Sequence, residues 1–179
     1  IGVIMMEVSR SVGPQDGFLQ KVRDLATKNG IVLMFDECTS GFRQTFGGLH
    51  KMYGVEPDMA MFGKALGNGY AITAIIGRRE IMEAAQTTFI SSTFWTERIG
   101  PTAALATLDV MSRTGSWSQI TKTGQAITQR WHELAKLHDL KITTGGLPSL
   151  TNFTFESPNA PAYKTLITQE MLNQGFLAS

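Results

Sequence analysis

The sequence is poor in cysteine, in charge and in long apolar runs, and each shortage excludes a class of protein. A single cysteine excludes an internal disulfide framework and a cysteine-rich metal site. Charged residues make up 17% of the chain, below the roughly 25% of an ordinary soluble domain. The formal net charge of +1 leaves no dense basic face for nucleic acid or a membrane surface. Because no apolar run reaches the roughly 18 residues of a membrane span, we expect a soluble, cytoplasmic chain without a nucleic-acid, membrane or metal partner.

Apolar residues and glycine are abundant instead. Hydrophobic residues make up 42% of the 179 residues, and there are 18 glycines. A chain of this composition hides much of its surface in a core or against partner chains. It opens on a strand-like apolar run at residues 1–6 without an initiator methionine, and it closes at 175–179, just after a predicted helix. These ends are typical of an internal segment of a longer protein.

Hydrophobic periodicity predicts alternating strands and helices. An apolar run at residues 1–8 is followed by a helix from about 17 to 28, with Asp16 as its N-cap, and by an apolar strand at 31–35. This order is a βαβ unit, which is right-handed by default. Further strands are predicted at residues 59–62 and 72–76, and further helices at 79–85, 97–111 and 117–137. The pattern predicts an α/β fold with a mainly parallel sheet flanked by helices.

The character of the chain changes near residue 140. Residues 141–144 and 151–155 alternate like half-exposed strands on either side of two glycines. We therefore predict part of a large domain over residues 1–115, a connecting helix over 116–139, and the beginning of a C-terminal α+β small domain over 140–179.

Two polar residues stand where predicted strands end. Asp36 follows the strand at 31–35, and Lys64 follows the strand at 59–62 with only Gly63 between. Ligands of open α/β sheets bind beyond the carboxyl ends of the strands, so a carboxylate and an amine are predicted to converge there. Spacing alone leaves two other interpretations open, a helix cap or loop carboxylate for Asp36 and an exposed loop lysine for Lys64.

The glycines around the lysine favour a functional role. Gly63, Gly67 and Gly69 carry no Cβ, so chain or ligand can approach Lys64 closely. In a confined, largely apolar setting a lysine amine loses charge stabilisation and becomes a usable nucleophile. A P-loop is excluded, because the Gly-Lys pair lacks the upstream glycine and the following Ser or Thr.

Three ordered blocks of the sequence resemble the class III (ω-type) aminotransferases: residues 35–43 (FDECTSGFR), 54–58 (GVEPD) and 62–69 (FGKALGNG). The resemblance extends over about residues 4–111 and is strongest to the glutamate semialdehyde aminomutase-like branch, which has a similar Thr-Gly-Phe-Arg stretch after the Asp-Glu pair. It implies the fold of a fold-type I transferase that uses pyridoxal 5′-phosphate (PLP), with residues 1–115 in the PLP-binding large domain.

The resemblance also implies roles for five residues. Lys64 would form a Schiff base with the cofactor aldehyde and later carry a proton. Asp36 would pair with the pyridine nitrogen and keep it protonated, so that the ring accepts electrons. Cys38 stands where the family usually has a valine against the ring face, and Thr39 where many relatives have a longer glutamine that binds the ring hydroxyl. Thr93 matches a threonine that binds the cofactor phosphate from the neighbouring subunit; its alternative is to cap the following helix.

Other polar residues are predicted to be structural. Glu37 and Arg43 are interpreted as hydrogen-bonding residues of the scaffold. The histidines form no metal-ligand spacing and are expected at the surface or partly buried; they are His50, His132 and His138.

The function that the resemblance implies is amino-group transfer between an amine or amino acid and a carbonyl compound, in a homodimer with sites at the subunit interface. An aminomutase of the glutamate semialdehyde type would use the same residues and remains an alternative. A non-catalytic PLP-fold scaffold is weakly favoured by an altered stretch at residues 95–98, but the presence of both Asp36 and Lys64 argues against it. A Rossmann-type dehydrogenase is disfavoured, since no Gly-x-Gly-x-x-Gly follows the first two strands.

Overall fold

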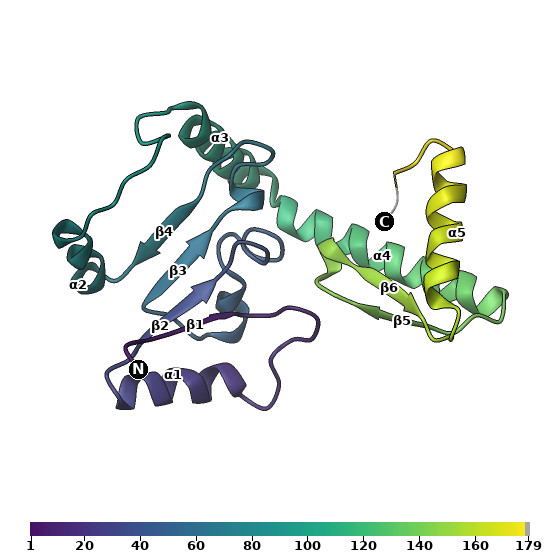
Figure 1. The fold of residues 1–179 in the computed structure, drawn as a ribbon, viewed down its shortest axis with the longest axis horizontal. Coiled ribbons are helices and arrows are strands. Elements are labelled where there is room, and N and C mark those ends of the chain that lie inside the picture. Colours follow the sequence, from purple (N-terminus) through teal and green to yellow (C-terminus); the bar gives the residue numbers. More distant parts are fainter. Residues whose placement is uncertain (178–179) are drawn as a thin grey trace. The chain divides into compact units, whose positions relative to one another are not determined.

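The computed structural model describes residues 1–177, and the chain divides into two compact units, Ile1–Lys122 and Thr123–Ser179 (Figure 1). The first unit contains β1 (Val3–Glu7), α1 (Phe18–Lys28), β2 (Val32–Asp36), β3 (Met59–Phe62), β4 (Ala74–Gly77), α2 (Arg79–Met82) and α3 (Ile99–Thr114). The long helix α4 (Ser116–Leu137) begins in the first unit and ends in the second, which adds β5 (Ile142–Gly145), β6 (Asn152–Phe155) and α5 (Ala160–Asn173). The predicted domain limits at 1–115, 116–139 and 140–179 stay a prediction, and residues 178–179 lie outside the described part.

A four-stranded sheet in the order β1-β2-β3-β4 organises the first unit. β1, β2 and β3 are parallel, and β4 pairs antiparallel with β3. The predicted βαβ unit is present as β1-α1-β2, and the mainly parallel sheet is confirmed. The direction of β4 was not predicted. It follows from the connection at residues 63–73, which is too short for the crossover of a dozen or more residues that a parallel strand needs.

The two faces of this sheet differ in burial. Leu33 and Phe35 of β2 point to one face and are fully buried, whereas the alternate residue Asp36 points to the other face and is half-buried. The strand register places Glu7 of β1 and Met61 of β3 on either side of Asp36. Asp36 therefore lies at the carboxyl end of a central strand, on the less covered face.

A buried aspartate ties α1 and the residue after β4 to the sheet. Oδ2 of Asp58 accepts hydrogen bonds from the Leu33 amide and from Arg23 of α1, both at 2.8 Å, and Oδ1 accepts one from Arg78 at 3.0 Å. Burial alone would raise the pKa of Asp58, but the Leu33 amide and the two guanidinium groups overcome it and hold the pKa below its usual range. The charge is thus well compensated.

The second unit packs a two-stranded hairpin against its own helices. β5 and β6 pair antiparallel, and Phe153 of β6 contacts Trp131 of α4 with ring centroids 4.9 Å apart. Gly124 of α4 lies so close to the loop before β6 that a Cβ there would stand 1.7 Å from the carbonyl oxygen of Pro148. This glycine is required by the close approach of loop and helix.

Three local predictions need correction. Asp16 does not cap α1, because Asp16 and Gly17 both have the left-handed backbone (φ 52° and 67°), whereas a capping side chain needs an extended one. The predicted helix at 79–85 is a single turn, α2, continued by a 3-10 helix at Glu83–Thr87. The helix predicted from residue 97 begins at Ile99.

Two kinds of feature are absent from residues 1–177. No helix there has the length and apolar character needed to cross a membrane. No group of three or more His, Cys, Asp or Glu side chains in this part is placed to hold a metal ion.

Candidate active site

The ends of β2 and β3 bring the predicted pair, Asp36 and Lys64, to one edge of the sheet. Asp36 is the last residue of β2, and Lys64 begins a 3-10 helix (Lys64–Leu66) two residues after β3 ends. Because β2 and β3 are parallel neighbours, their carboxyl ends meet at the same edge. The placement expected from the sequence is therefore observed.

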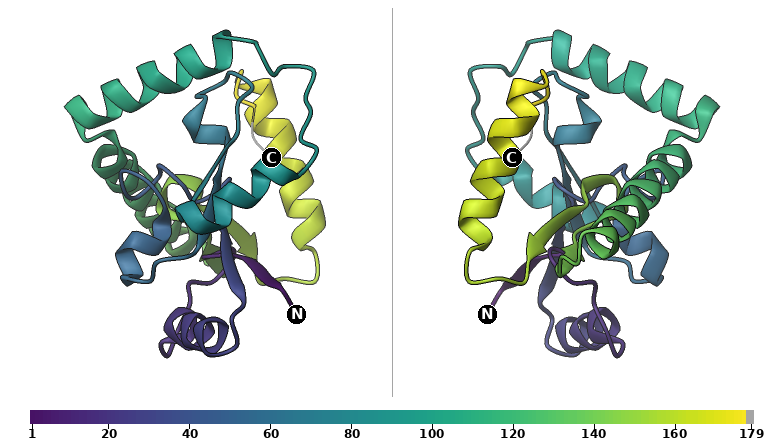
Figure 2. Two further views of the ribbon diagram at one scale, coloured as in Figure 1. Left: turned by 90° about the vertical axis from the view of Figure 1, so that its left-hand side faces the viewer. Right: turned by 90° about the vertical axis from the view of Figure 1, so that its right-hand side faces the viewer.

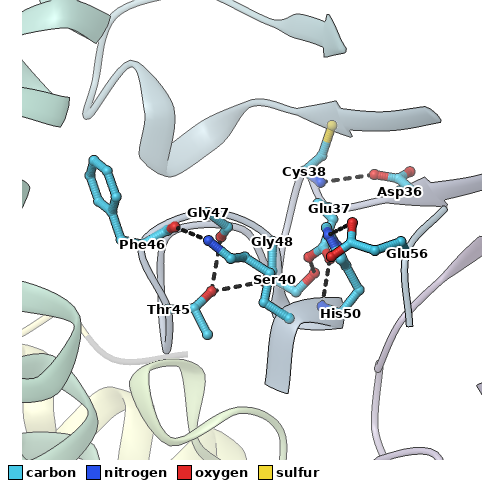
Figure 3. Close-up of polar contacts among 11 residues, drawn as sticks. Asp36, Glu37, Cys38, Ser40, Thr45, Phe46, Gly47, Gly48, His50 and Glu56 are labelled. Carbon is cyan, nitrogen blue, oxygen red and sulfur yellow. Dashed lines mark hydrogen bonds and ion pairs between the residues drawn. The ribbon is translucent and has the colours of Figure 1, made fainter. Parts of the chain in front are cut away.

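The Asp36 carboxylate is fixed by its own turn. The amide of Cys38 donates a hydrogen bond of 2.9 Å to Oδ1 of Asp36 (Figure 3). A bond between an aspartate side chain and the amide two residues on is a common way to lock such a turn. No hydrogen bond within residues 1–177 reaches Oδ2, so the half-buried carboxylate offers one free acceptor at the sheet edge.

Lys64 reaches back toward the turn that follows β2. Its Nζ donates a hydrogen bond of 2.5 Å to Oγ1 of Thr39. The backbone of Lys64 is left-handed (φ 44°), an uncommon conformation for a residue with a side chain and one that clusters at functional sites. Lys64 is exposed, so the confined apolar setting expected from the sequence is wrong for the described chain. Its amine is bound by the Thr39 hydroxyl rather than enclosed by an apolar wall.

Cys38 lies between the two turns. A Cβ built on Gly63 would stand 3.5 Å from Sγ of Cys38, so the residue before Lys64 passes close to the Cys38 thiol. Burial raises the pKa of the Cys38 thiol, and the nearby Asp36 carboxylate raises it further, against the smaller opposing effect of Lys64. The thiol thus stays neutral at neutral pH, as a small packing side chain would.

A buried carboxylate anchors the turn that carries Asp36, Cys38 and Thr39. Glu37 is fully buried, and its Oε2 accepts a hydrogen bond of 2.5 Å from Oγ of Ser40. Its Oε1 lies 2.7 Å from Nδ1 of His50 and accepts a bond of 3.0 Å from the His50 amide (Figure 3). Burial would raise the pKa of Glu37, but these hydrogen bonds lower it below its usual range.

This network confirms the structural role expected for Glu37 and corrects the placement of His50. The histidine is only 7% exposed, although it was expected at the surface or partly buried. Thirteen residues separate it from Glu37, and no local spacing rule links residues so far apart. The ring also fills the space beside Gly48, where a Cβ would lie 2.3 Å from its atoms.

Arg43 fixes the same turn from the other side. Its Nε donates a hydrogen bond of 2.8 Å to the carbonyl oxygen of Thr39, and its own carbonyl accepts one of 3.4 Å from Thr121 of α4. Burial lowers the pKa of Arg43. The structural role expected for this residue is confirmed, and Thr39 is held at both its main chain and its side chain.

Thr93 is separate from this group. It lies in the exposed connection between α2 and α3, which has no helix or strand from residue 88 to 98 (Figure 2). Its alternative role as a helix cap is wrong, because α3 begins six residues later. Glu97 takes that role: its carboxylate accepts hydrogen bonds from the amides of Ile99 and Gly100.

The fold is that of the PLP-dependent transaminases of fold type I. Nearly all of the chain, 99%, superposes on the FumI protein of Sphingopyxis sp. MTA144, solved as its PLP internal aldimine form, with a TM-score of 0.92, 22% identity and 44% of that chain covered. An omega-transaminase from Sphaerobacter thermophilus superposes on 98% with a TM-score of 0.83, 21% identity and 44% of its length. The predicted fold class is confirmed.

The chain belongs to the family described as Aminotransferase class-III, which residues 10–178 match. It is 34% identical over 174 residues to the 3-aminobutyryl-CoA aminotransferase of Cloacimonas acidaminovorans, and this match spans 94% of the chain and 42% of the relative. It is 32% identical over 168 residues to the glutamate-1-semialdehyde 2,1-aminomutase of Methanocaldococcus jannaschii, and this match spans 90% of the chain and 39% of the relative. The chain thus spans about two fifths of the length of these curated relatives.

Proposed function

We propose that the protein containing this chain is a PLP-dependent enzyme that transfers an amino group between an amine or amino acid and a carbonyl compound. The observation that carries the proposal is the placement of Asp36 and Lys64 at the carboxyl ends of two neighbouring parallel strands, on one edge of the sheet. Family membership and the aminotransferase and aminomutase relatives support it.

The residues present fit the cofactor. Within residues 1–177, Oδ2 of Asp36 is a free, half-buried acceptor suited to a protonated pyridine nitrogen, and the exposed amine of Lys64 is bound through the Thr39 hydroxyl. The neutral thiol of Cys38 offers a small apolar surface beside both. When bound, PLP supplies an electron-accepting ring that stabilises a carbanion next to the substrate nitrogen.

Each residue then has a defined task. Asp36 would hold the proton on the ring nitrogen, and Lys64 would bind the cofactor aldehyde and later carry a proton. Cys38 would pack against the ring, and Thr39 would face the ring hydroxyl. Thr93 would bind the cofactor phosphate of a partner subunit, which fits its place in an exposed connection.

The proposal includes a homodimer and a cytoplasmic location. The connection at residues 88–98 exposes aromatic side chains, with Phe89 95% and Phe94 71% exposed, as expected of a surface that a second copy covers. The cytoplasmic location is supported by the single cysteine, which leaves the chain without internal disulfides.

An aminomutase is the second candidate, because glutamate semialdehyde aminomutases are among the relatives. It would use Asp36 and Lys64 in the same way and return the amino group to the same molecule. Product analysis with separate amino donors and acceptors distinguishes the two: a transaminase converts both partners, and an aminomutase isomerises one. A non-catalytic scaffold would do neither.

The test is chemical trapping on the complete protein. The protein is incubated with PLP and reduced with borohydride, and the modified peptide is mapped by mass spectrometry. We expect a pyridoxyl group on Lys64, none in Lys64→Ala, and loss of turnover in that variant. Lys51, another lysine of the first unit, gives the matched control Lys51→Ala, which should be labelled normally at Lys64. A folded protein without an adduct on Lys64 would overturn the proposal.

A further inference from the structure

The turns after β2 and β3 touch through a single pair of polar side chains, Thr39 and Lys64. The contact joins Oγ1 of Thr39 to Nζ of Lys64 at 2.5 Å, which is short for a bond between an amine and a hydroxyl. The resemblance to the family gives this position a different task, binding of the cofactor ring hydroxyl by a longer side chain.

Thr39 is held rigidly in place by its neighbours. Its carbonyl oxygen accepts the 2.8 Å hydrogen bond from Arg43, and the next residue, Ser40, is buried and bound to Glu37. The amide of Gly41 donates a further bond of 2.7 Å to the carbonyl of Glu37, which closes the turn around Thr39. The hydroxyl is therefore presented from a fixed backbone.

Lys64 has a fixed backbone and an exposed side chain. The carbonyl of Lys64 accepts hydrogen bonds of 3.2 Å from the amides of Gly67 and Asn68, and Gly63 lies against Cys38. The four-carbon side chain beyond this backbone is exposed, and a lysine loses much rotamer freedom when its end is fixed. Within residues 1–177, the Thr39 hydroxyl is the hydrogen-bond partner that fixes this end.

We propose that Thr39 is a positioning residue that holds the amine of Lys64 at the carboxyl edge of the sheet whenever this amine is not joined to the cofactor. The inference rests on the proposed function, in which the same amine binds the cofactor aldehyde. The free amine occurs twice: before the cofactor is captured, and while substrate occupies the cofactor and Lys64 carries a proton. In both states a pre-oriented nitrogen needs less ordering to react than a mobile one.

The consequence is a faster capture of PLP by the apo protein. In the capture, Nζ forms a bond to the aldehyde carbon, and the aldehyde oxygen leaves as water with the two protons of the neutral amine. Thr39 takes no part in this bond change; it places the nitrogen. Removing the hydroxyl should slow the capture and leave the final amount of Lys64 adduct unchanged.

The experiment uses the complete apo protein and three substitutions at one site. Thr39→Val keeps the shape and removes the hydroxyl, Thr39→Ala removes it with a smaller side chain, and Thr39→Ser restores it. Thr107→Val is the control, since the Thr107 hydroxyl donates only within α3, to the carbonyl of Ala103. PLP is added, borohydride quenches the mixture at successive times, and the Lys64 adduct is quantified by mass spectrometry.

We expect capture to slow about tenfold in Thr39→Val and Thr39→Ala, as for the loss of one hydrogen bond that orients the neutral amine, and to stay within about twofold of wild type in Thr39→Ser and Thr107→Val. In turnover, the hydroxyl-free variants should lower kcat and leave KM for the amino donor unchanged, which a general loss of structure would not do.

Three results would overturn the inference. Capture at the wild-type rate in Thr39→Val would show that the hydroxyl does not place the amine. Equal slowing in Thr39→Val and Thr39→Ser would assign the effect to packing. A changed visible spectrum with unchanged capture would assign Thr39 to the cofactor ring instead. These results differ from failure of the proposed function, in which wild type itself forms no adduct on Lys64.

Discussion

The turn after β2 and the connection between α2 and α3 both carry residues of the proposed site, but their surroundings are opposite. The turn at residues 36–50 is held by a fully buried carboxylate, a buried histidine and an arginine, all from this chain. The connection at residues 88–98 is exposed and has no regular structure. The edge that carries Asp36 and Lys64 is thus built by the chain itself, whereas the phosphate contact proposed for Thr93 needs a surface that covers the connection.

The largest effect is expected where the rigid turn meets the chemistry. Asp36→Asn keeps the shape and the bond from the Cys38 amide but removes the charge opposite the ring nitrogen. We expect PLP capture on Lys64 to persist and turnover to fall on the order of a hundredfold or more. Steady-state kinetics and borohydride trapping on the complete protein measure both. Wild-type turnover in this variant would contradict the role of Asp36.

The next effect tests the rigidity of the turn. His50→Ala removes the imidazole partner of Oε1 of the buried Glu37 and leaves the Ser40 hydroxyl on Oε2, so we expect the free energy of unfolding to fall by about 3 kcal/mol. Glu56→Gln is the control, because Glu56 is 79% exposed and 3.7 Å from the same ring, and it should cost at most about 1 kcal/mol. Urea denaturation at one protein concentration measures both. Equal, small losses would mean that the turn does not depend on this pair.

Acid should loosen the same turn. The pKa of Glu37 is below the ordinary value of 4.5, so the folded state binds this proton less readily than the unfolded state. The carboxylate therefore stabilises the fold above pH 4.5, and this contribution is lost as the pH falls through the lowered pKa. Asp58 acts with the same sign, so Glu37→Gln isolates the contribution of Glu37. As the pH is lowered, the Tm of the variant should fall less steeply than that of the wild type. Parallel curves of Tm against pH for the two proteins would refute this.

The smallest effect is expected in the exposed connection. Phe89→Ser removes a side chain that is 95% exposed, so the fold of one subunit should be unchanged, while association of two copies weakens about tenfold. Phe18→Ser on α1, where the ring is 50% exposed, is the control and should leave association unchanged. Sedimentation over a range of concentrations measures both. A monomeric wild type, or equal association of all three proteins, would remove the distinction between turn and connection.

Local pattern was enough for most of the first unit. The strand at 59–62 has the predicted limits, and the pairing of Asp36 with Lys64 at one edge follows from strand ends alone. Patterns failed where a longer-range contact decides. Asp16 was predicted as a cap but has a left-handed backbone, and His50 was expected at the surface or partly buried but is buried against Glu37. The residues next to Asp16 and His50 in the sequence indicate neither this backbone conformation nor this burial.

The sequence by itself determined the parallel α/β order, the family and the two strand-end residues, because hydrophobic period and strand ends are local properties of the chain. Only the tertiary structure decided that β4 runs antiparallel to β3, and that Glu37 and His50, thirteen positions apart, form a hydrogen bond. It also decided that the Thr39 hydroxyl reaches the Lys64 amine. These features depend on where separate segments come to rest in space, since a short, directional hydrogen bond forms only after the sheet has brought both partners to the same edge.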